Sequence, residues 1–206
     1  MAFPFLTVFM VFIIGLSIRY AVLNKRREEK FDRFWEKEKE ADHTPAKDLS
    51  TVSFLKVPIQ SFPMGKWEDD EIAMIEERLR ALSEKKLLNL TGKTNTELKL
   101  EYGTANLEIM SAIGEDFNEL TVLLVDYAKA LMEKHDYEGA AAVLEYGMSV
   151  GTDVSSDYTL LADCYLALGH PEKIELIKEQ VQNRHLLLEQ KIISYLDACT
   201  DPTADR

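Results

Sequence analysis

The chain has 206 residues and a formal net charge of −12, with 24 basic and 36 acidic side chains. This balance argues against nucleic acid as a partner, because such binding draws its affinity mainly from Lys and Arg on phosphates. The two cysteines, Cys164 and Cys199, fit neither a metal-ligand spacing nor a disulfide framework, which is typical of a reducing compartment.

The amino-terminal segment contains no charged side chain before Arg19. About 20 apolar residues cross a bilayer as a helix, and the apolar run resumes after Arg19, whose long side chain reaches the interface from near a helix end. We therefore expect a transmembrane anchor over residues 1–23, embedded in the lipid bilayer. A cleaved secretory signal is the alternative, but such signals carry positive charge before the apolar run, and none is present here.

Charge around the anchor predicts its orientation. No basic side chain precedes the apolar run, whereas four follow closely: Arg19, Lys25, Arg26 and Arg27. By the positive-inside rule, the amino terminus lies outside the cell membrane and the rest of the single-pass protein is cytoplasmic. Residues 19–40 carry a net charge of +2, so the chain from residue 41 onward carries −14.

Residues 24–41 alternate in charge at a spacing that favours a solvated juxtamembrane helix. Phe31, Phe34 and Trp35 fall on one face of this helix. They could dock a protein partner or the membrane surface, or pack against the chain's own domain.

Residues 42–66 read as a proline-containing extended linker, with Pro45, Pro58 and Pro63. The stretch 52–62 is more apolar than a plain tether. We expect it to lie extended against the helical domain, over the partner groove or elsewhere, with these candidate anchors: Phe54, Val57, Ile59 and Phe62.

From residue 67 the pattern is helical. A first helix over 68–88 has carboxylates in its opening turn and an apolar face made of Ile72, Ile75, Leu79 and Leu82. A capping box at Thr94 and Glu97 opens a second helix over 96–113, which we expect Gly114 to end. Four more helices follow in two pairs, over 117–135 with 137–150 and 156–168 with 172–183.

The two pairs repeat at a fixed period. Their inter-helix turns, at Asp136-Tyr137 and His170-Pro171, lie 34 residues apart, and 34 is the tetratricopeptide period. The segment Tyr158-x2-Leu161-Ala162-x2-Tyr165 resembles the first-helix pattern of the tetratricopeptide-repeat (TPR) family. The earlier copy, Leu124-x2-Tyr127-Ala128-x2-Leu131, has the same order of sizes. The later copy departs in its second helix, where Ile174 and Lys178 replace a small and a large apolar residue.

The resemblance implies an all-α fold in which antiparallel helix pairs stack as a solenoid over residues 67–198. Two repeats bury too little core alone, so helices 68–88 and 96–113 are expected to form a divergent third pair. A last helix over 185–198 would cap the stack, with Leu188, Ile192, Tyr195 and Leu196 facing inward. Residues 199–206 are expected to be a flexible tail.

The family binds protein segments in a concave groove lined by the first helix of each pair. Lys129 is the only cation among the groove positions, which argues against capture of a terminal carboxylate and favours an apolar partner segment. Mapped onto this sequence, the groove positions are Val122, Val125, Lys129, Met132, Ser156, Thr159, Asp163 and Leu166.

No catalytic motif, phosphate-binding loop or metal-ligand spacing occurs in the sequence, so no cofactor and no metal is expected. We expect a non-catalytic, membrane-anchored scaffold or adaptor that binds a protein partner. The alternatives are an extracytoplasmic, anchored chaperone-like repeat protein of a bacterial envelope and an organellar import receptor with the same layout. A helical platform for an enzyme is a further alternative.

Overall fold

The computed structural model describes the backbone of residues 4–200 and the side-chain surroundings of residues 8–200. This part of the chain is helical and contains no strand, only an isolated bridge between Leu55 and Leu87. The all-α prediction is therefore confirmed. Internal contacts divide the chain into two compact units, one formed by residues up to 49 with 93–108, the other by 50–92 with 109 onward.

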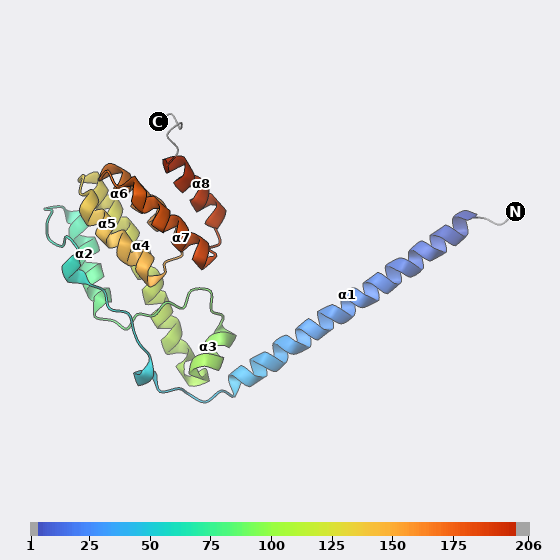
Figure 1. Ribbon diagram of the computed structural model, residues 1–206. Coiled ribbons are helices and arrows are strands. Elements are labelled where there is room, and N and C mark those ends of the chain that lie inside the picture. Colours follow the sequence, from blue (N-terminus) through green and yellow to red (C-terminus); the bar gives the residue numbers. More distant parts are fainter. Residues whose placement is uncertain (1–3, 201–206) are drawn as a thin grey trace. The chain divides into compact units, whose positions relative to one another are not determined.

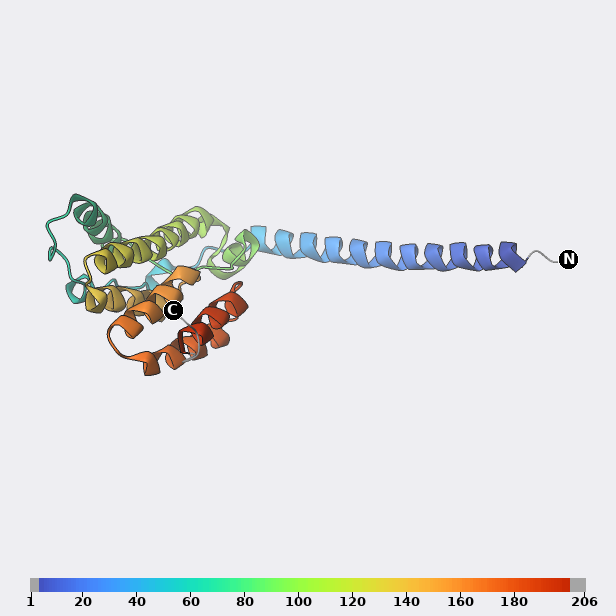
Figure 2. The ribbon, with the colours of Figure 1, turned by 90° about the horizontal axis from the view of Figure 1, so that it is seen from above.

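The first unit begins with one uninterrupted helix, α1 (Pro4–Asp42), which joins the predicted anchor and the predicted juxtamembrane helix (Figures 1 and 2). Its described apolar portion is long and apolar enough to span a membrane, and none of it is buried within the protein. The four basic side chains that predict the orientation are exposed on this helix: Arg19, Lys25, Arg26 and Arg27. Residues 1–3, where the predicted anchor starts, lie outside the described residues.

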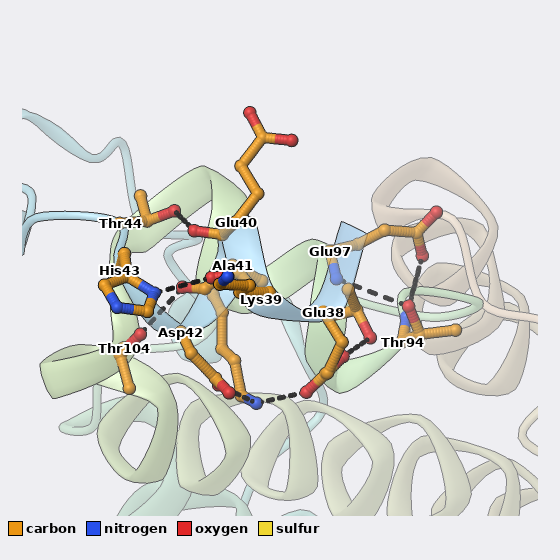
Figure 3. A network of polar contacts seen from close by, with 12 residues as sticks. Glu38, Lys39, Glu40, Ala41, Asp42, His43, Thr44, Thr94, Glu97 and Thr104 are labelled. Carbon is orange, nitrogen blue, oxygen red and sulfur yellow. Dashed lines mark hydrogen bonds and ion pairs between the residues drawn. The ribbon is translucent and has the colours of Figure 1, made fainter. Parts of the chain in front are cut away.

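Helix α3 (Asn95–Tyr102) packs against the carboxyl-terminal end of α1. The predicted capping box is confirmed, since the Thr94 hydroxyl accepts the Glu97 amide while the Glu97 carboxylate accepts the Thr94 amide (Figure 3). The helix ends at Gly103, whose φ of 88° suits glycine, and a side chain there would collide with the Pro45 carbonyl. The predicted helix over 96–113 is thus wrong, because the chain breaks at Gly103.

Helix α4 (Leu107–Glu133) runs through Gly114, so the prediction that Gly114 ends a helix is wrong. A glycine inside a long helix costs only about 1 kcal/mol relative to alanine, and the buried face of α4 offsets that cost. The expected pairing of 68–88 with 96–113 is also wrong, because α3 belongs to the first unit with α1.

The second unit contains α4 and five further helices around one hydrophobic core. The bounds of these five further helices agree with the predicted ones to within a few residues, except that α2 ends five residues before its predicted end. They are α2 (Asp70–Ser83), α5 (Tyr137–Val150), α6 (Ser155–Ala167), α7 (Ile174–Arg184) and α8 (Glu189–Thr200). Between residues 4 and 200 there are also four short 3-10 turns: η1 (Leu49–Thr51), η2 (Ile59–Ser61), η3 (Thr104–Asn106) and η4 (Pro171–Lys173).

Two contacts organise the later helices. Helices α5 and α6 share the most extensive contact, and Gly147 faces Asp157 within it, while α8 lies beside both α6 and α7 (Figures 1 and 2). Ile192 and Leu196 of α8 are buried, as expected, but Leu188, which precedes the helix, and Tyr195 are exposed, so the prediction that these two face inward is wrong. The helix continues to Thr200, so the predicted tail boundary at 199 is wrong, and residues 201–206 lie outside the described residues.

The predicted linker is built into the second unit from Ser50 onward. Phe62 is buried with its ring edge against Tyr146 of α5, at 5.8 Å between centroids, and the Tyr146 hydroxyl donates to the Lys56 carbonyl at 3.1 Å. Val57 and Ile59 pack half-buried on the core, while Phe54 lies under the Lys86 ammonium. The expectation that this segment packs on the helical domain is confirmed.

Two carboxylates hold the end of this segment. Glu76 accepts the Gly65 amide, and Asp136 accepts the Lys66 ammonium at 2.8 Å and the Trp67 indole at 3.3 Å. Asp136 also caps α5 through the Gly139 amide. Burial raises the pKa of Asp136, but the hydrogen bonds from Lys66, Gly139 and Trp67 outweigh that effect and hold the pKa below its usual value.

Candidate functional site

A hollow of about 600 Å³ lies between α6 and α8 and reaches the turn that joins α4 to α5. Its wall is mostly apolar, with one carboxylate and two tyrosines. The lining residues are Met132, Tyr137, Asp163, Leu166, Ala167, Tyr195, Ala198 and Cys199. We call this hollow, defined by these eight residues, the α6/α8 groove.

The groove follows from the amphipathicity of the two helices. Helix α6 buries Tyr158, Leu161 and Tyr165 in the core, which leaves Asp163 and Leu166 on its other face. Helix α8 buries Ile192 and Leu196, so Tyr195 projects beside them toward α6. An ion pair between Lys178 of α7 and Asp197 of α8, at 2.8 Å, helps to fix α8 in place.

One polar contact spans the groove. The Tyr195 hydroxyl donates to Asp163 Oδ1 at 2.7 Å, and burial together with this carboxylate raises the pKa of Tyr195. No ion pair with a described Lys or Arg neutralises Asp163. Residues 109–200 hold six basic and sixteen acidic side chains, a net charge of −10, so the groove lies in an acidic surface.

The eight predicted groove positions do not all lie in one groove. Met132, Asp163 and Leu166 come together in the α6/α8 groove, while Lys129 lines a separate depression of about 330 Å³ between α2 and α4. Val125 is buried in the core, so its assignment to a groove surface is wrong. Val122 is exposed, and Ser156 and Thr159 are half-buried; none of these three lines the α6/α8 groove.

The sequence mapping missed the contribution of α8. Tyr195, Ala198 and Cys199 line the groove because α8 packs beside α6, and Tyr137 joins them from the first turn of α5. The sequence predicted only that Tyr195 lies on the inward face of its helix. Which other helix lies next to Tyr195 is determined by tertiary contacts, which the local pattern does not contain. Residues 52–62 do not line this groove, since they pack on α5 and beside α2.

The groove holds one thiol, that of the half-buried Cys199, and its lining includes no histidine or lysine. Cys164, on the buried side of α6, has its pKa raised to about 12 by burial and by Asp163, which disfavours the thiolate. Among the residues that the structure describes, no three His, Cys, Asp or Glu side chains gather into a possible metal site. The arrangement is suited to binding by contact and charge.

No protein-family model, no curated protein and no solved structure matches this chain.

Proposed function

We propose that this protein is a single-pass, membrane-anchored adaptor whose helical domain has a TPR-like arrangement and holds a protein partner at the cytoplasmic face of the membrane. The observation that carries the proposal is the α6/α8 groove, which combines an apolar wall with the unneutralised carboxylate of Asp163. The apolar part of α1 supports the anchor, and the basic residues after it support the orientation.

The groove chemistry favours a particular kind of partner segment. Apolar side chains would fill the space between Met132, Leu166 and Ala198, and a Lys or Arg on the same segment would reach Asp163. The surrounding acidic surface would attract such a basic segment and repel an acidic one. Anchoring would raise the local concentration of the bound partner near other membrane components.

The groove can be tested by one charge reversal. We expect Asp163→Lys to reduce partner crosslinking from a photoreactive residue at position 166 by about ten-fold in cells, since one charge-assisted hydrogen bond is worth roughly that factor. Asp153→Lys makes the same change of net charge at an exposed position in the loop before α6 and should leave the crosslink unchanged. Equal crosslinking in both variants would contradict a role for the groove.

The orientation can be tested separately. An export-dependent reporter fused after Thr200 should be inactive, and a cytoplasm-dependent reporter at the same site should be active, because the basic residues follow the apolar run. Introducing three lysines directly after Met1 while replacing Arg19, Lys25, Arg26 and Arg27 by Asn should reverse both readouts. Activity of the export-dependent reporter in the unaltered chain would favour the extracytoplasmic alternative.

A further inference from the structure

Three aromatic side chains stand exposed on α1, beyond its apolar portion. The side chains of Phe31, Phe34 and Trp35 are 60%, 54% and 54% exposed. The Trp35 ring packs edge-on against the other two rings, with centroids 5.8 Å from that of Phe31 and 5.6 Å from that of Phe34. We call these three residues the aromatic stripe. Clustered aromatic surface of this kind is costly in water and typically marks an interface.

The bilayer is too far away to cover the aromatic stripe. Because α1 is one continuous helix, Phe31 lies about 12 Å and Trp35 about 18 Å beyond Leu23 along its axis, at 1.5 Å per residue. The headgroup layer extends only about 5–8 Å past the hydrocarbon on each side. A typical tilt of about 20° shortens these distances by less than a tenth. A protein surface is therefore the better candidate.

The aromatic stripe continues a face of α1 that is already an interface. From Glu38 onward that face is covered by α3: the Lys99 ammonium bonds Glu38 and, at 2.7 Å, Asp42, two carboxylates that are labelled in Figure 3. Ala41, on the same face, is fully buried, and the Thr104 hydroxyl donates to its carbonyl at 2.8 Å. Since α3 begins at Asn95, beside Glu38, the preceding turns of this face have no cover within the first unit.

We infer that a second copy of α1 covers the aromatic stripe, so that the protein forms a parallel dimer through its juxtamembrane helices. A shared anchor gives both copies the same direction and the same depth, which is the condition for parallel, in-register pairing. The inferred seam follows a 3–4 spacing along α1, the heptad spacing of coiled coils. Its positions are Met10, Ile13, Ser17, Tyr20, Asn24, Arg27, Phe31 and Phe34.

Side-chain chemistry along this seam is complementary between identical copies. In parallel packing, Phe34 enters a hole formed by Phe31, Phe34 and Trp35 of the second copy. Arg27 comes beside Glu28 of the second copy, and Lys30 comes beside the ring of its Trp35, an ion pair and a cation–π contact. The seam ends at Phe34, because α3 occupies the same face from Glu38 onward.

The test is disulfide crosslinking of the full-length protein in its membrane. In a Cys199→Ser background, with Cys164 buried, Phe34→Cys and Asn24→Cys place a thiol in the seam. Glu36→Cys and Glu29→Cys place it on the opposite face as matched controls. We expect about ten-fold more disulfide-linked dimer from the seam positions, because a disulfide needs Cα atoms within about 7 Å.

A second variant separates the aromatic stripe from the anchor. Phe31→Ser with Phe34→Ser, in the Asn24→Cys protein, should lower dimer formation several-fold while α1 stays helical, because both side chains are more than half exposed. Equal dimer from seam and control positions would overturn the inference. So would disulfide crosslinks from the seam positions to a different protein. The inference depends on the anchor but not on the α6/α8 groove, so either can fail alone.

Discussion

Replacing Gly147 by alanine is expected to lower the free energy of unfolding by about 2 kcal/mol, because overpacking a close helix contact typically costs 1–3 kcal/mol. An added Cβ would lie 3.1 Å from Asp157 Cγ and closer still to Oδ1. Asp157 is fully buried and has little room to move. The measurement is urea unfolding of the full-length protein in detergent, monitored by circular dichroism.

Gly114→Ala is the matched control. Both glycines are helical, but a Cβ at position 114 would meet the Leu90 side chain at 3.5 Å, an ordinary contact. Alanine should therefore raise the free energy of unfolding there by up to about 1 kcal/mol, the intrinsic helix preference. The two substitutions should have opposite signs. Equal effects would show that α5 and α6 do not approach as closely as the structure has them.

Asp157 provides an internal check on that contact. Neither of its carboxylate oxygens has a hydrogen-bond partner in the described structure, and burial raises the pKa of Asp157 well above its usual value, offset only in part by Arg184. In an Asp157→Ala background, Gly147→Ala should lose most of its cost, since the clashing oxygen is gone. A double-mutant cycle that shows no coupling between the two positions would contradict the contact.

Local patterns predicted the elements well where a helix has one apolar face. The apolar spacing of Ile72, Leu79 and Leu82 predicted the buried side of α2, and the capping box at Thr94 predicted the start of α3. These features depend on residues within a few turns of one another. The continuous α1 was less evident, because a change from apolar to charged residues does not itself interrupt a helix.

Breaks between helices were harder to predict. Gly103 and Gly114 are both glycines within helical sequence, yet only Gly103 has a positive φ and a backbone neighbour, Pro45, where a side chain would be. That neighbour is more than fifty residues earlier in the chain. The difference is a tertiary one, which the local pattern does not contain.

The candidate groove was predicted only in part for the same reason. Met132, Asp163 and Leu166 could be mapped from the repeat spacing, whereas Tyr195 enters the groove because α8 packs beside α6. Val125 has the spacing of a surface position but joins the core cluster. Helical periodicity gives the faces of a helix, and the neighbours of each face come from the packing of the whole unit.

Replacing Glu76 by alanine is expected to lower the free energy of unfolding by about 3 kcal/mol, because it removes a buried carboxylate and leaves the buried Tyr127 hydroxyl and the Gly65 amide without their acceptor. The Gly65 amide donates to both carboxylate oxygens of Glu76 at 2.8 Å, and the hydroxyl of the buried Tyr127 donates to one at 3.0 Å. This single side chain thereby joins the end of the predicted linker to α2 and α4.

The consequence for the linker can be measured directly. In the Glu76→Ala protein, amides around Phe62–Gly65 should exchange hydrogen faster, while the Leu55 amide, bonded to the Leu87 carbonyl at 2.8 Å, should stay protected. Glu77→Ala, on the exposed side of the same turn, should change the free energy of unfolding by less than about 0.5 kcal/mol. If the two variants behaved alike, residues 62–65 would be held by apolar contact alone, and Glu76 would not be the group that fastens the linker to the helical domain.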